Sequence, residues 1–171
     1  LVCFAIKSNT NINLFREIRK FGLGADVVSA GELMTALKAG IDPKKIVFSG
    51  VGKTSIEINY AINKKILLIN AESKSEINEI ERIARSKNKI VNIGIRLNPN
   101  TDAKTLKQIS TGKKENKFGV NEKMFFDLVN YSKLSKNINL KCLSVHIGSQ
   151  ILDHKPYEKM LKVVDRIIKK S

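Results

Sequence analysis

The chain has 171 residues, enough for one hydrophobic core, and it contains no apolar stretch of eighteen residues, which excludes a transmembrane helix. The net charge of +15 suggests nucleic acid, but the basic residues are scattered rather than gathered in a block, and seven Phe and three Tyr offer few rings for stacking, so we expect neither a nucleic-acid nor a membrane partner. Cys3 and Cys142 lack metal-ligand spacing and indicate core thiols of a cytoplasmic protein.

The first element is an apolar run over residues 1–6 that closes with Lys7 and opens into a polar stretch at 8–11. This pattern predicts a buried strand that empties into a loop. A lysine at that point either extends to solvent or is held in a pocket as a nucleophile, and the run alone leaves both interpretations open.

Along the rest of the chain, short runs rich in Val and Ile alternate with helical periodicity. The runs predict strands at 1–7, 25–29, 45–49, 66–70, 90–97 and 140–147. The helical pattern predicts helices at 12–21, 30–39, 54–63, 75–87, 122–135 and 156–170. Runs that are apolar almost throughout, such as 66–69, indicate parallel strands covered on both faces.

Six consecutive β/α units fit either a doubly wound sheet or part of an eight-fold barrel. A nucleotide-binding sheet calls for GxGxxG after its first strand, and the turn at 7–11 has no glycine. Six units extrapolate to roughly 230 residues for eight, which is barrel size. We therefore predict a TIM-type (β/α)8 barrel, truncated to about six units. Because residue 1 falls inside a predicted strand and 163–170 inside a predicted helix, we expect a piece of a longer chain.

Polar residues recur where the predicted strands end, which is the side of a barrel where active sites lie. One amine, one carboxylate, one guanidinium and one imidazole would then converge on one opening. These strand-end residues are Lys7, Asp26 with Ser29, Ser49-Gly50, Asn70 with Ser73, Arg96 with Asn98, and His146 to Gln150.

Two glycine-containing stretches bear on whether the chain binds a phosphate. Gly148-Ser149 follows His146 and forms a small turn whose hydroxyl and N–H groups suit a phosphate, although a lone histidine ending a strand is also a common structural residue. Gly52-Lys53-Thr54 matches only the tail of a P-loop, because the leading glycine of that motif falls at Val47.

Together these segments resemble the barrel domain of the fold-type III pyridoxal-phosphate decarboxylases. Each stretch is weak alone, but they occur in family order over nearly the whole chain. The matching stretches are residues 4–9, 22–33, 46–53, 95–99, 110–112 with 117–119, and 146–150.

The resemblance implies a role for each of five residues. Lys7 forms the internal aldimine with pyridoxal 5′-phosphate and His146 stacks on the ring, so these two are the catalytic candidates. Asp26 lies near the pyridine side, Arg96 lies beneath the cofactor, and Ser149 binds its phosphate. Residues 1–171 would then be a partial pyridoxal-phosphate-binding barrel domain.

Within the family, Ser149-Gln150 and the 96–99 stretch are more like the branch that decarboxylates the amino acid meso-2,6-diaminopimelate to L-lysine than the ornithine or arginine branches. A non-catalytic pyridoxal-phosphate carrier and a nucleic-acid-binding module are the alternatives from other classes. Leu106 stands where relatives commonly have histidine. The resemblance implies that strands seven and eight and a carboxyl-terminal β-domain, which complete the site across a homodimer, lie outside residues 1–171.

Overall fold

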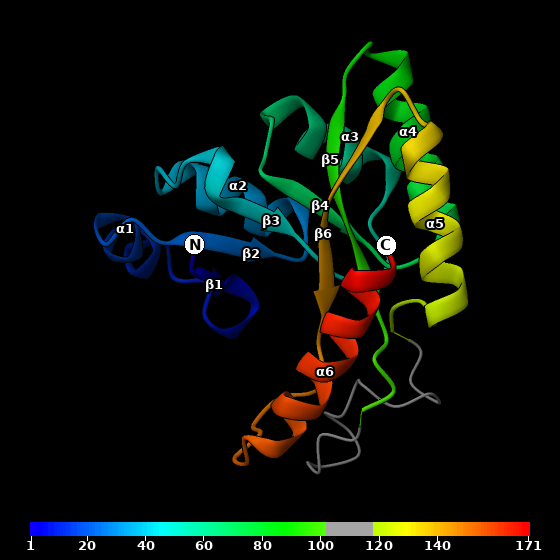
Figure 1. Ribbon diagram of the computed structural model, residues 1–171. Helices are drawn as coiled ribbons and strands as arrows, with labels where there is room; N and C mark the ends of the chain where they lie inside the picture. The colour runs from blue at the N-terminus through cyan, green and yellow to red at the C-terminus, as the bar shows by residue number, and fades with distance from the viewer. Residues whose placement is uncertain (102–117) are drawn as a thin grey trace.

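The computed structural model describes residues 1–101 and 118–171, so Leu106, the 110–112 stretch and Lys117 lie outside the described residues. Within these ranges, strands and helices alternate along the chain (Figure 1). The strands are β1 (Cys3–Ala5), β2 (Gly24–Val27), β3 (Ile46–Phe48), β4 (Leu68–Ala71), β5 (Val91–Leu97) and β6 (Ile138–Val145). The α-helices are α1 (Ile12–Lys20), α2 (Ala30–Lys38), α3 (Ser55–Lys64), α4 (Lys74–Ser86), α5 (Glu122–Leu134) and α6 (Lys155–Lys170), and 3-10 turns span Ile6–Ser8 and Pro43–Lys45.

The described strands form one parallel sheet in chain order, β1 to β6. The strands change direction along the sheet: β2 runs roughly horizontally in Figure 1, whereas β5 and β6 run roughly vertically. A change of direction along the sheet is expected, because parallel sheets twist. Among the described strands, β1 and β6 each pair on one side only, so the sheet is open, as expected for a truncated barrel. The predicted α/β architecture is confirmed, with boundaries that differ by a few residues.

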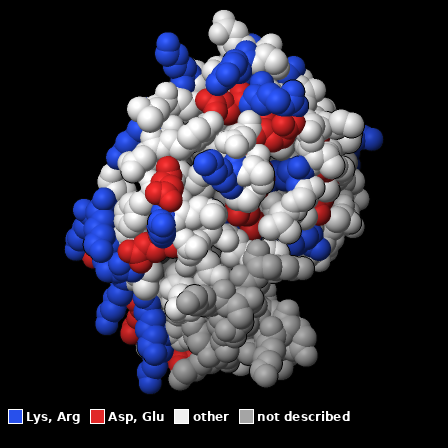
Figure 2. Space-filling model, turned by 90° about the vertical axis from the view of Figure 1, so that its right-hand side faces the viewer, with Lys and Arg blue, Asp and Glu red and all other residues white. Residues whose placement is uncertain are grey.

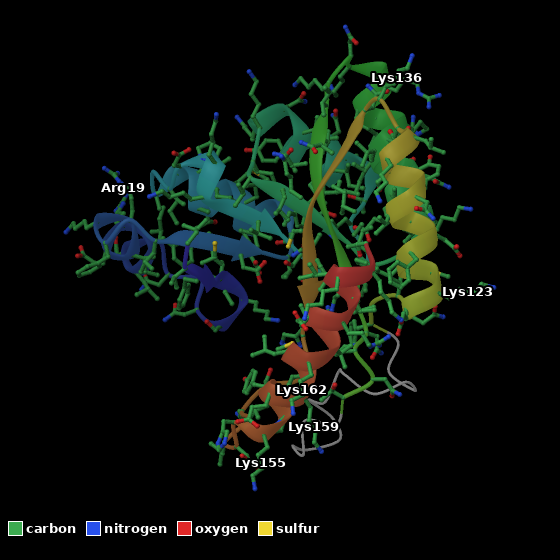
Figure 3. All side chains as sticks on the ribbon, in the orientation of Figure 1. Arg19, Lys123, Lys136, Lys155, Lys159 and Lys162 are labelled. Atoms are coloured by element: carbon green, nitrogen blue, oxygen red, sulfur yellow. The ribbon has the colours of Figure 1, made fainter. Side chains whose placement is uncertain are left out.

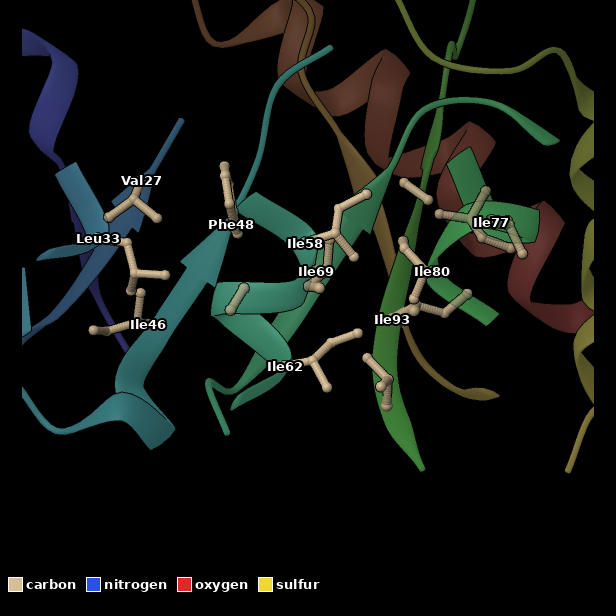
Figure 4. Packing of buried hydrophobic residues seen from close by; sticks show 14 of the residues in the cluster. Val27, Leu33, Ile46, Phe48, Ile58, Ile62, Ile69, Ile77, Ile80 and Ile93 are labelled. Atoms are coloured by element: carbon tan, nitrogen blue, oxygen red, sulfur yellow. The ribbon is translucent and has the colours of Figure 1, made fainter. Parts of the chain in front are cut away.

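Alternate strand residues face the helices and form the core. Figure 4 shows Val27, Phe48 and Ile69 of the strands packed against Leu33 of α2, Ile58 of α3 and their neighbours. Because side chains alternate across a strand, the residues between these positions point to the opposite, concave face. On β2 and β3 those intervening residues are Asp26 and Val47, which are paired in register.

Side-chain caps fix where the helices begin. Ser29 accepts a hydrogen bond from the Glu32 N–H at the start of α2, and Ser73 does the same for Glu76 at the start of α4. Such caps each stabilise a helix by about 1 kcal/mol. The sequence pattern placed Ser29 and Ser73 among the strand-end polar residues. In the structure, both residues cap helices.

The basic side chains are dispersed over the surface. Figure 2 shows lysines and arginines among acidic and uncharged residues on one face, and Figure 3 shows Arg19, Lys123, Lys136 and Lys159 projecting away from the sheet. In the part of the chain that the structure describes, no helix combines the length and apolar character needed to cross a membrane.

A buried carboxylate joins α4 to α5. Glu81 accepts hydrogen bonds from the hydroxyl of Tyr131 and from Ser135 Oγ at 2.6 Å, and Arg85 lies 3.6 Å away. The hydrogen bonds from Ser135 and Tyr131 lower the pKa of Glu81 below its ordinary value, against the opposing effect of burial. Ionised Glu81 therefore stabilises the packing of these two helices.

Replacement of Glu81 by glutamine is expected to lower the free energy of unfolding by about 1–3 kcal/mol at neutral pH. Because the folded pKa lies below the unfolded one, the contribution of ionised Glu81 is complete above the ordinary glutamate pKa of about 4.3 and is lost as pH falls through the folded value. Urea unfolding at a series of pH values should show the difference from wild type narrowing in that acidic range. The exposed Glu17→Gln variant serves as control, and a Glu81→Gln effect that does not change with pH would contradict this account.

Candidate functional site

A cavity of about 520 Å³ opens at the carboxyl ends of the strands. Lys7, Asp26, Arg96 and His146 all line it, so the structure brings together four of the five residues that the sequence predicted. Ser149 follows three positions after His146 and is not part of this lining. A hollow of about 630 Å³ between the end of β5 and α6 lacks both Lys7 and His146, so the smaller cavity is the candidate site.

The strand register explains why these side chains meet. Asn70 is paired with Gly94, and Arg96 is paired with Ser144, so the polar residues of β4, β5 and β6 lie side by side on the concave face. Gly94 is required there, because a Cβ at this position would lie 2.1 Å from Asn70 Oδ1. The absence of a side chain on β5 thus gives the Asn70 amide its place in the pocket.

Lys7 lies in the 3-10 turn Ile6–Ser8 and not in a strand, because β1 ends at Ala5. The turn is held by Ser8 Oγ, which donates to the Ala5 carbonyl at 2.7 Å, and by the Asn9 N–H, which donates to the Ile6 carbonyl at 2.9 Å. Ile6 is fully buried and anchors the turn, whereas Lys7 is exposed at the rim of the cavity. The amine is therefore accessible to a bound molecule.

A hydrogen-bonded chain crosses three strands and ends at Asp26. Asn70 Nδ2 donates to Ser49 Oγ at 3.1 Å, and Ser49 Oγ donates to Asp26 Oδ1 at 2.5 Å. Burial raises the pKa of Asp26, while the Ser49 hydrogen bond and the charges of Lys7 and other nearby cations oppose that rise. Because the Ser49 hydroxyl accepts from Asn70, its proton is directed at the carboxylate, which fixes the orientation of Asp26.

Glu72 is a site residue that the sequence reasoning missed. It follows β4, is 6% exposed, and its Oε1 accepts a hydrogen bond from Arg96 Nη1 at 2.9 Å. The Arg96 guanidinium also lies 5.2 Å from the centre of the Phe118 ring. Glu72 stands two positions after Asn70, so the strand alternation that placed Asn70 in the pocket could have found it.

His146 is the first residue after β6. Burial lowers the pKa of its imidazole, and the positive charges of Arg96 and Lys7 lower it further, against a smaller opposing effect of Glu72. The ring is therefore neutral at neutral pH. A neutral imidazole that is exposed at the cavity is suited to packing against a flat aromatic ligand.

Cys3 differs in placement from the sequence interpretation, whereas Lys53 agrees with it. Cys3 lines the cavity and is half-buried, because it lies on the concave face of β1 rather than in the core. The amine of Lys53, within the glycine-rich stretch rejected as a P-loop, is buried and bonded to the Gly50 and Asn70 carbonyls at 2.5 and 2.7 Å and to Glu76 at 2.6 Å. Lys53 therefore holds the β3–α3 loop and is not a phosphate-binding amine.

Comparisons of this chain with known proteins all point to one family. Residues 1–171 match the model of the "pyridoxal-dependent decarboxylase, pyridoxal binding domain" family. The diaminopimelate decarboxylase of Helicobacter pylori strain J99 is 47% identical over 169 residues, covering 99% of this chain and 42% of that relative. The diaminopimelate decarboxylase of Aquifex aeolicus is 42% identical over 164 residues, covering 96% of this chain and 39% of the relative.

The fold agrees with the same relatives. The crystal structure of Helicobacter pylori diaminopimelate decarboxylase complexed with L-lysine superposes with a TM-score of 0.98 at 46% identity, over 99% of this chain and 43% of that one. The open sheet of this chain thus corresponds to the barrel of that enzyme. The chain spans 42% of the length of the Helicobacter relative.

Proposed function

This chain belongs to the pyridoxal-dependent decarboxylase family, and we propose that the full-length protein containing it decarboxylates meso-2,6-diaminopimelate to L-lysine. The observation that carries the proposal is the convergence of Lys7, Arg96 and His146 on one cavity at the carboxyl ends of the strands. The substrate follows from relatives at 42–47% identity that are diaminopimelate decarboxylases. The ornithine and arginine alternatives are not favoured by these comparisons.

The cavity fits pyridoxal phosphate, which is the cofactor of this family domain. Its volume of about 520 Å³ lies in the usual range for small-ligand sites. It presents an accessible amine at its rim, and the buried oxygens Asn70 Oδ1 and Glu72 Oε2 have no hydrogen-bond partner among the described residues. Buried acceptors without donors call for a bound group or an ordered water.

Each predicted residue can then be given a task. When bound, pyridoxal phosphate would supply an electron sink for the electron pair released on loss of carbon dioxide. Lys7 supplies the amine that attaches the cofactor, and His146 supplies a neutral ring that packs on one face. Asp26, oriented by Ser49, supplies a negative charge on the pyridine side. Arg96 supplies a fixed positive charge beneath the cofactor, and Ser149 with its neighbouring N–H groups holds the phosphate.

The proposal extends to the assembly of the full-length protein. The resemblance supports a partial barrel domain at residues 1–171, completed by further strands and a carboxyl-terminal β-domain. It also supports a homodimer, in which a partner subunit contributes to the site, and a cytoplasmic location. Two isolated cysteines and a dispersed surface charge agree with this view.

Turnover by the full-length protein tests the function. Carbon dioxide release would be measured with pyridoxal phosphate and, in separate assays, meso-diaminopimelate, ornithine and arginine. We expect kcat/KM to be highest with meso-diaminopimelate. A higher kcat/KM with ornithine or arginine would overturn the substrate, and cofactor binding without release of carbon dioxide from any of the three would overturn the enzymatic activity.

A further inference from the structure

We propose that Glu72 is a positioning residue of the pyridoxal site, which fixes the guanidinium of Arg96 through one carboxylate oxygen and places its negative charge beside the cavity that His146 lines. This inference rests on the proposed function for the identity of the ligand. It adds to the site a carboxylate that the sequence motifs did not indicate.

The backbone at Glu72 is firmly held. Its N–H donates to Glu76 Oε2 at 3.0 Å, and the other oxygen of Glu76 accepts from the buried amine of Lys53 at 2.6 Å. Glu76 is in turn held at the start of α4 by the Ser73 cap. The position of Glu72 is therefore set by the junction of β4 with α4 and does not depend on a ligand.

The side chain of Glu72 meets Arg96 in a single-oxygen contact. Oε1 accepts from Arg96 Nη1 at 2.9 Å, and the exposed fractions of the two side chains are 3% for Glu72 and 14% for Arg96. The Phe118 ring, whose centre lies 5.2 Å from the guanidinium carbon, is a second contact of Arg96. A charged hydrogen bond at this burial orients the guanidinium more strongly than an exposed pair would.

The second oxygen, Oε2, is buried and has no hydrogen-bond partner among the described residues. A buried carboxylate oxygen is costly to leave unpaired, so an enclosed water would satisfy Oε2, and the charge of Glu72 acts on the cavity through Arg96. Asn70 Oδ1, two positions earlier on the same face, is a second such acceptor.

The charge of Glu72 also balances the cations around His146. Arg96 on β5 and Lys7 after β1 lower the pKa of the imidazole together with burial, and Glu72 after β4 raises it. Asp26 on β2 lines the same cavity. Removal of the Glu72 charge would leave the guanidinium unopposed and lower the pKa of His146 further.

The test compares Glu72→Gln, Glu72→Asp and the control Glu79→Gln in the full-length protein. Glu79 pairs with Arg82 on its own helix, outside the cavity. In cofactor-free protein, NMR titration of His146 should show a lower pKa in Glu72→Gln than in wild type, with little change in the charge-retaining Glu72→Asp. The dissociation constant for pyridoxal phosphate should rise about 10- to 100-fold in Glu72→Gln, the range for loss of a charged hydrogen bond.

The outcomes separate this inference from the proposed function. Wild-type protein that fails to bind pyridoxal phosphate would overturn the function. Wild-type binding with an unchanged dissociation constant and an unchanged His146 titration in Glu72→Gln would overturn the role of Glu72 alone. If Glu72→Gln does not fold, Glu72→Asp still decides, because its shorter side chain keeps the charge but cannot hold Arg96 in place. Weaker cofactor binding with a wild-type His146 titration then supports the role, and wild-type affinity contradicts it.

Discussion

Replacement of Lys7 by methionine is expected to abolish covalent attachment of pyridoxal phosphate and to slow decarboxylation by about 10²-fold or more, because the cofactor loses the bond that holds it in position. Lys7 lies at the cavity rim, where its amine is accessible, and methionine has similar length without a nucleophilic nitrogen. The measurements are carbon dioxide release and borohydride reduction of the loaded full-length protein, followed by peptide mapping.

Lys123→Met provides the matched control, because Lys123 projects from α5 away from the sheet (Figure 3). It should retain wild-type turnover and labelling. In wild type, the reduced pyridoxyl group should map to Lys7. A label on another lysine, with Lys7 unmodified, would show that a different amine attaches the cofactor.

A large loss of stability is expected on replacement of Lys53 by methionine. The side chain of Lys53 is 1% exposed, and its amine donates hydrogen bonds to the Glu76 carboxylate and to two carbonyl oxygens. Its removal leaves a carboxylate and two carbonyls without their donor, and breaking a buried pair in this way costs about 3–5 kcal/mol. Because one of those carbonyls belongs to Gly50, which lines the cavity, cofactor affinity should fall as well.

Urea unfolding of the barrel in the full-length protein measures this effect. The free energy of unfolding of Lys123→Met should stay within about 0.5 kcal/mol of wild type, as is usual for an exposed site. If Lys53→Met were as stable as this control, the buried contacts of Lys53 would have no net stabilising effect, and its hold on the β3–α3 loop would not matter to the fold.

Local pattern was sufficient to predict the order of strands and helices. Short apolar runs mark the strands, and Ser29, Thr54 and Ser73 begin helices by capping them. The end of β1 was predicted two residues too late. Apolar character extends to Ile6, but the Ser8 and Asn9 hydrogen bonds close a 3-10 turn there, and turn closure of this kind has no signal in hydrophobic pattern.

The site was partly predictable, because local pattern also locates the strand ends. Asp26, Arg96 and His146 each stand at or near a strand end, and parallel strands bring such ends together. The contacts between them were not predictable, because Ser49 to Asp26 and Glu72 to Arg96 each join residues more than twenty positions apart. Cys3 was misplaced because a half-buried cysteine on the concave face has the same apolar neighbours in sequence as a core cysteine.

The position of Lys7 after β1 and His146 after β6 couples ligand binding to folding. Bringing the two residues to one cavity closes a loop that spans most of the chain, at an entropic cost that rises with the logarithm of its length. Pairings between such distant segments are slow to form. A molecule that contacts both residues therefore binds only chains whose intervening strands are assembled, and it adds about 2.7 kcal/mol of stability at a free concentration one hundred times its dissociation constant. Cofactor supply during synthesis thus raises the proportion of chains that complete folding.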